Sequence, residues 1–311
     1  METQKKNVEL GAVFLALAGA ILFSAKAVMV KLAYNYEIDP VSLLLLRMGF
    51  ALPFYIAIAL RSKNPTGSQP TQKDYLWVVV MGFVGYYLAS YFDFYGLQFI
   101  DASLERLILF VYPTLVLLIS WLVLRKAIAK IQMVAILITY LGIYVAFMDK
   151  LSPGSSSNPL LGGIFIFLSA LTYAIYLIGS GQLLPKFGTK KFTSYAMIVS
   201  CICVIAHFSI QGSTQLFGYP WEVYALGLGM ALFSTVFPSF LISEAIKRIG
   251  ASTVSIIGSV GPISTIILAS IFLYEHISAY QIAGTAIVIS GIILVGRSKG
   301  KKKETEKAIA R

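Results

Sequence analysis

Hydrophobic residues form ten long runs along the chain, separated by short polar segments. Each run has the length of about 17 or more residues that a helix needs to cross a lipid bilayer. The runs lie near residues 11–34, 41–60, 75–98, 102–124, 131–148, 160–179, 193–210, 221–243, 252–273 and 280–296. The pattern predicts an all-α integral membrane protein with ten transmembrane helices. The first run contains two lysines and leads into further runs, so we expect a retained helix and not a cleaved signal sequence.

The second half of the chain repeats the first at an interval of 149 residues. The repeated residues are Ala102, Ser103, Pro113, Leu124, Ile128, Gln132 and Gly142, which recur as Ala251, Ser252, Pro262, Leu273, Ile277, Gln281 and Gly291. Each half contains five predicted spans, and two copies with an odd number of spans insert in opposite orientations. We therefore expect two inverted five-helix repeats, 1–150 and 151–298, joined by a polar linker at 151–157 and followed by a basic tail, 299–311.

Composition agrees with a membrane environment, because 58% of the residues are hydrophobic and only 13% are charged, against about 25% charged in soluble domains. Of 25 lysines and arginines, only Lys150 falls in a predicted outer loop, and Lys26, Lys31, Arg47 and Arg106 lie within spans. All the others fall on one side if the N-terminus is cytoplasmic, as the positive-inside rule requires. This predicts a multi-pass protein of the cell (inner) membrane with both termini in the cytoplasm. The net charge of +11 is thereby explained without nucleic acid, and lipid is the expected partner of the basic tail.

Several classes of function are disfavoured by what the sequence lacks. It contains no phosphate-binding G-x-x-x-x-G-K-[ST] motif, which argues against ATP-driven transport by this chain alone. Its two histidines lie in unrelated positions, and Cys201 and Cys203 face different sides of one helix, so neither a metal site nor a set of catalytic residues is predicted. We expect no enzyme activity and no cofactor.

Charged residues inside the first five spans are the strongest candidates for function, because a charge at the bilayer centre costs about 2.5–3.5 kcal/mol on insertion scales. The candidates are Lys26, Arg47, Asp93, Glu105 and Arg106. Lys31 is shallow enough to reach the interface. In one interpretation the two acids only neutralise two of the three bases. In the other, the remaining positive charge binds a carboxylate or phosphate of a solute.

Within this cluster Lys26 is the leading candidate, because it is the deepest and a buried lysine can also exchange a proton. Protons are thus one candidate coupling ion. Glu105 is placed to interact with a helix N-terminus, either in the cluster or only as a capping group. On the third and fourth spans, Tyr86 and Tyr112 lie too deep for an interfacial aromatic belt, so we expect them to line a cavity. The repeated prolines Pro113 and Pro262 free backbone carbonyls and are expected to bend their helices.

Several motifs together resemble the EamA-type repeat of the drug/metabolite transporter superfamily. Near the C-terminus, the run from Phe272 to Ile277 places an acidic residue, Glu275, between the last two spans, and Gln281 and Gly291 follow. The run from Pro40 through Arg47 to Phe50 resembles the second span of the family, and the repeated Ala-Ser and Pro positions resemble its fourth and ninth spans. One departure is that the first half has Lys126 where the second has Glu275.

The resemblance implies ten helices in two inverted repeats, no cofactor, and export or exchange of small metabolites through a central cavity. It implies that spans one, three, four, six, eight and nine line this cavity, and that the fifth and tenth are peripheral. It also favours an anchoring role for Arg47 and a gating or structural role for Glu275.

The expected function is a secondary active transporter that exports amino acids or related zwitterionic or anionic metabolites by alternating access. Export of cationic or aromatic drug-like compounds is a variant, which the net positive interior disfavours. A receptor or scaffold without transport activity is the alternative from another class, but it leaves the repeat and the interior charges unexplained. The oligomeric state stays open.

Overall fold

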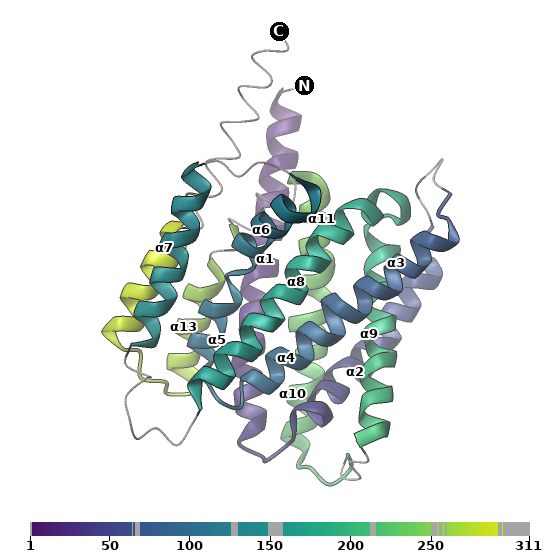
Figure 1. Ribbon diagram of the computed structural model, residues 1–311. Helices are drawn as coiled ribbons and strands as arrows, with labels where there is room; N and C mark the ends of the chain where they lie inside the picture. Colours follow the sequence, from purple (N-terminus) through teal and green to yellow (C-terminus); the bar gives the residue numbers. More distant parts are fainter. Residues whose placement is uncertain are drawn as a thin grey trace.

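The structure is a computed structural model, and it describes residues 2–63, 65, 69–125, 130–148, 158–211, 216–249, 254, 257–258, 260–291 and 294. Within this part of the chain all regular structure is helical (Figure 1). The predicted linker 151–157, the tail 299–311 and the residues Lys126, Lys150, Ala251 and Ser252 lie outside the described residues.

Helical segments follow one another along both halves. The first half contains α1 (Glu2–Tyr34), α2 (Pro40–Arg61), α3 (Gln72–Gly82), the π-helix η1 (Phe83–Leu88), α4 (Ala89–Gly96), α5 (Ala102–Leu109), α6 (Tyr112–Leu124) and α7 (Lys130–Phe147). The second half contains α8 (Pro159–Phe187), α9 (Thr189–Gln211), α10 (Trp221–Ala231), the π-helix η2 (Leu232–Val236), α11 (Phe237–Ile249), α13 (Val260–Phe272) and a further helix, Ala279–Gly291.

Seven helices in the described residues are long and apolar enough to cross a membrane. They are Gly11–Tyr34, Pro40–Arg61, Gln72–Gly96, Ala102–Val123, Pro159–Phe187, Thr189–Gln211 and Trp221–Ile249. Shorter apolar helices, Met133–Ala146, Val260–Phe272 and Ala279–Gly291, lie in the other three predicted runs. The all-helical class expected from the hydrophobic pattern is thus found, and apolar side chains such as Phe14 and Leu60 remain exposed on the outside, as a lipid environment requires.

Local sequence explains where several helices begin. Asp39 caps α2, its carboxylate accepting from the backbone N–H groups of Val41 and Ser42, and Pro40 occupies the first turn, where a missing N–H is harmless. The fourth apolar run is interrupted at Phe110 and Val111, within one turn before Pro113, because a proline cannot donate to the carbonyl four residues earlier. Pro262 likewise lies in the first turn of α13.

The two π-helices begin one repeat interval apart, at Phe83 and Leu232. Each interrupts an otherwise continuous span, α3–η1–α4 in the first half and α10–η2–α11 in the second. Single π-turns inside α-helices occur often at functional sites. The π-helices thus occupy matching positions in the two halves. The hydrophobic pattern did not predict this structural feature of the repeat.

Helices of one half pack mainly against helices of the other. The most extensive contacts join α2 to α9, α1 to α11 and α13, and α4 to α8. In Figure 1, α7 and the helix Ala279–Gly291 lie side by side at one edge, where Gly142 and Gly284 allow their backbones to approach closely. The interior between the halves is therefore formed by the other helices.

Candidate functional site

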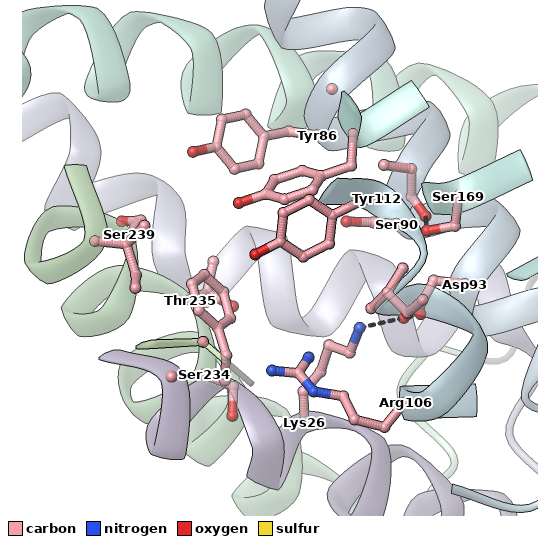
Figure 2. Close-up of a pocket in the computed structure, with 18 of the residues that line it drawn as sticks. Lys26, Tyr86, Ser90, Asp93, Arg106, Tyr112, Ser169, Ser234, Thr235 and Ser239 are labelled. Carbon is pink, nitrogen blue, oxygen red and sulfur yellow. Dashed lines mark hydrogen bonds and ion pairs between the residues drawn. The ribbon is translucent and has the colours of Figure 1, made fainter. Parts of the chain in front are cut away.

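A cavity of about 140 Å³ lies between the two halves (Figure 2). The first half contributes side chains from α1, α2, η1, α4, α5 and α6, and the second half from α8, α9, η2 and α11. Of the candidates predicted from the sequence, the structure brings six to the lining of this one cavity: Lys26, Arg47, Tyr86, Asp93, Arg106 and Tyr112.

Lys26 forms the centre of a buried ionic cluster. Its Nζ lies 2.5 Å from Asp93 Oδ2 and 3.4 Å from Glu105 Oε1. The three residues come from α1, α4 and α5, and the two acidic side chains are only 2% and 0% exposed. Opposite charges so placed offset part of the large cost of burying them. Lys26 thus offsets part of the negative charge of Asp93 and Glu105, and Glu105 does not belong to the cavity lining.

Arg47 is anchored on the wall of the cavity. Its Nη2 donates to Ser90 Oγ at 2.7 Å, and the guanidinium lies over the Phe94 ring, 4.8 Å from the ring centroid. Both partners are on α4, so Arg47 ties α2 to α4. This geometry fits the anchoring role that the family resemblance implied for Arg47.

Arg106 lines the same cavity without such an anchor. The residue is 9% exposed, and its Nε is buried with no hydrogen-bond partner. Figure 2 shows its guanidinium pointing into the space below Tyr112 and beside Lys26. No ion pair joins Arg106 to a carboxylate within the described residues. Three cationic groups and two carboxylates therefore surround the cavity and its wall, so one positive charge is in excess. Neither arginine forms an ion pair within the described residues, but Arg47 is held by Ser90 and Phe94, whereas Arg106 points into the cavity.

Tyrosines form another part of the cavity wall. The hydroxyls of Tyr86 and Tyr176 lie 3.0 Å apart, and Tyr112 meets Tyr173 edge to face with ring centroids 5.3 Å apart. Tyr86 and Tyr112 come from the first half and Tyr173 and Tyr176 from α8. Tyr86, Tyr112 and Tyr173 line the cavity, whereas Tyr176 only contacts Tyr86, so the aromatic wall contains rings from both halves.

Hydroxyl groups of the second half complete the lining. Ser169, Ser234, Thr235 and Ser239 all face the cavity. Ser169 Oγ donates to the Ala89 carbonyl at 2.7 Å, and Thr235 Oγ1 on η2 donates to the Met230 carbonyl of α10 at 2.9 Å. The pattern of charges and aromatic residues in the sequence did not identify these groups.

Glu275 does not line the cavity; its carboxylate caps the N-terminus of α5. Its Oε1 accepts from the Ala102 N–H at 2.8 Å, and Oε2 accepts from the Ser103 N–H at 3.2 Å and the Ser103 hydroxyl at 2.7 Å. The carboxylate satisfies N–H groups that the first turn of a helix leaves free. A second-half residue therefore holds the end of a first-half helix, and Glu105 does not act as the cap.

Comparison with known proteins identifies the family. The EamA-like transporter family matches residues 10–148 and again 160–297. The chain is 29% identical to the uncharacterized transporter YcbK of Bacillus subtilis over 97% of its own length and 98% of that protein. It is 24% identical to the uncharacterized transporter sll1319 of Synechocystis sp., covering 94% and 95% of the two chains.

A solved crystal structure shares the fold, with a TM-score of 0.66 over 91% of this chain and 95% of that one, at 15% identity. The family matches cover most of the chain, and the apolar helices fit the membrane environment in which such transporters work. The chain belongs to the EamA-like transporter family of the drug/metabolite transporter superfamily and is a multi-pass membrane protein.

Proposed function

We propose that this transporter is a secondary active exporter of amino acids or related small zwitterionic or anionic metabolites. The observation that carries the proposal is the unpaired Arg106 guanidinium in a cavity built from both halves. A buried cation without an acceptor is costly, and a solute carboxylate supplies one. The tyrosines and hydroxyls of the lining then accommodate the rest of the solute.

Alternating access explains why the site lies between two repeats. In this proposal ten helices form two inverted five-helix repeats, 1–150 and 151–298, and the cavity opens to one side of the membrane at a time. Support comes from the two separate family matches, the paired prolines Pro113 and Pro262, and the π-helices one repeat interval apart. With the basic residues on the inner side, both termini lie in the cytoplasm and the protein resides in the cell membrane.

In this orientation Glu275 belongs to the outer gate. Its hydrogen bonds to Ala102 and Ser103 join the loop after α13 to the start of α5, at the end of the molecule where α1 finishes. Lys31 adds a second tie at this end, because its Nζ donates to the Leu97 carbonyl at 3.1 Å. Opening toward the outside requires that these contacts break.

A cationic substrate fits the cavity less well. Asp93 is the one acidic residue among the described residues of the lining, and Lys26 already contacts it at 2.5 Å. A cationic solute would have to displace Lys26 while facing Arg47 and Arg106. The charge balance therefore favours solutes with a carboxylate, and protons remain the proposed coupling ion through the Lys26 cluster.

The test is to profile metabolites in the medium of cells that overexpress the native chain, Arg106→Ala, or Arg61→Ala. Arg61 is an exposed arginine at the end of α2 and serves as the matched control. We expect a carboxylate-bearing solute to accumulate outside with the native chain and Arg61→Ala, and to fall at least tenfold with Arg106→Ala at equal expression. No solute accumulating with the native chain would contradict export.

A further inference from the structure

We propose that Gly261, on α13, forms a specificity-determining notch that seats the Arg106 guanidinium and so fixes a carboxylate subsite in the cavity. The inference rests on the proposed function and deepens it, because it names the group of the solute that is recognised and a second-half residue that sets its position.

The notch is occupied by Arg106 itself. A Cβ added at Gly261 would lie 2.8 Å from Arg106 Nη2, 3.0 Å from Nε and 3.3 Å from Cζ. All three of its nearest neighbours are thus guanidinium atoms, at distances too short for an ordinary contact. The guanidinium fills the volume where any other residue would place its own side chain.

The repeat shows that the notch is an asymmetric feature. Gly261 lies one repeat interval after Tyr112, just as Pro262 lies one interval after Pro113. In the first half this position carries a large ring that lines the cavity. In the second half it carries no side chain, and a cation from the first half takes that space. The two repeats therefore differ at this position. The first contributes the Tyr112 ring to the lining, and the second leaves space for the Arg106 guanidinium.

Hydrogen bonds fix the backbone that forms the notch. Ser24 Oγ donates to the Gly261 carbonyl at 3.1 Å, and Thr265 Oγ1 donates to the Ser24 carbonyl at 3.2 Å. The Gly261 N–H also donates to the Gly258 carbonyl at 2.7 Å. Since α13 is tied to α1 at Gly261 and at Thr265, an added methyl group will displace the end of the flexible arginine and not the helix.

The seated guanidinium needs an acceptor that the cluster does not provide. Asp93 and Glu105 both contact Lys26, and Glu275 caps α5. A carboxylate matches the planar fork of an arginine and forms strong, charge-assisted hydrogen bonds with it. Lys26, Arg47 and Arg106 against Asp93 and Glu105 leave one positive charge in excess, which favours a monocarboxylate over a doubly charged phosphate.

Benzoate and benzamide test the subsite, because they share ring and size but differ in charge. Isothermal titration of the purified full chain in detergent should give at least tenfold tighter binding of benzoate. Gly261→Ala should weaken benzoate binding at least tenfold and leave the weak benzamide binding within twofold. Gly49→Ala is the matched control, since a Cβ there meets nothing within 4 Å, and it should bind benzoate as the native chain does.

Equal binding of the two probes, absence of benzoate binding, or native affinity in Gly261→Ala would each overturn the inference.

The contact between Gly261 and the Arg106 guanidinium is checked through thermal stability. Gly261→Ala should lower the Tm less in an Arg106→Ala background, because the added methyl group then has room, and equal shifts in both backgrounds would contradict the notch. Benzoate binding without metabolite export would refute the proposed transport and leave the subsite standing.

Discussion

Lys26 contacts two carboxylates that have almost no contact with solvent. Asp93 and Glu105 are buried on α4 and α5, and both contact the Lys26 ammonium. Removing one member of a buried ionic group leaves the others uncompensated, which costs more than the group contributes as a whole. At the scale of single residues, Lys26 therefore supports the fold whether or not a solute reaches it.

Lys26→Met is expected to lower the free energy of unfolding by about 3–5 kcal/mol, because two buried carboxylates lose their counter-ion. Thermal or denaturant unfolding in detergent measures this loss. Arg248→Met is the control, since Arg248 and Glu244 form a pair that is 40% and 34% exposed, and exposed pairs contribute about 0–1 kcal/mol. Adding Asp93→Asn and Glu105→Gln to Lys26→Met should restore most of the stability. A loss no larger than that of the control would contradict the account.

The sequence identified the charged part of the candidate site and missed its hydroxyl part. Charges are rare and costly within spans, so each one in an apolar run draws attention. Serines and threonines such as Ser169 and Thr235 satisfy their hydroxyls on nearby backbone carbonyls and occur anywhere on a membrane helix. Only the packing of the helices reveals which of them face the cavity.

At the scale of helices, the hydrophobic pattern located the apolar runs because their length and composition are set by the bilayer. Pro113 also marked the interruption between α5 and α6, since its missing N–H is a local property. The π-helices η1 and η2 could not be predicted in this way. A π-turn changes the hydrogen-bond pattern of the helix but leaves the apolar composition of the run unchanged.

Glu275 joins two helical elements of different halves, and its removal is expected to loosen the proposed outer gate. A reporter cysteine, Ser234→Cys in a Cys201→Ser/Cys203→Ser chain, places a thiol in the cavity. Glu275→Ala should raise its labelling by a membrane-impermeant maleimide from outside severalfold, because α5 loses a cap worth about 0.5–2 kcal/mol. Unchanged labelling from outside would contradict the gate.

The reciprocal change tests the same gate from the other side. The repeat aligns Lys126 with Glu275 and Ala251-Ser252 with Ala102-Ser103, and a lysine cannot accept hydrogen bonds. Lys126→Glu is therefore expected to add an inner cap and to lower labelling of the same thiol from the cytoplasmic side in inverted vesicles. The charge-preserving Lys126→Arg is the matched control. Equal labelling of the two variants would rule out this symmetry argument.

At the scale of the whole molecule, the two repeats are units of sequence but not separately packed bodies. The most extensive helix contacts, α2 with α9, α1 with α11 and α4 with α8, all cross between the halves. The sequence could predict the repeat from matching residues. It could not predict this interleaving, which depends on contacts between residues far apart in the chain.

Because the halves bury their faces against each other, neither half is expected to fold alone. Residues 1–150 or 151–311 expressed separately should be degraded, whereas co-expression should restore folded protein and export. Membrane levels of each half, measured with and without the other, provide the test. Stable accumulation of either half by itself would contradict the interdependence of the two halves.

Two-sided access to the cavity is the most direct measurement of the central claim. The Ser234→Cys thiol should react with an impermeant maleimide from the outside of cells and also from the cytoplasmic face of inverted vesicles. Ser200→Cys, a buried position on α9 away from the lining, should stay unlabelled from both sides. Labelling of the cavity from both faces is the result that alternating access predicts. Alternating access would be contradicted if the thiol reacted from one face only, both under conditions that favour the outward-open state and under conditions that favour the inward-open state.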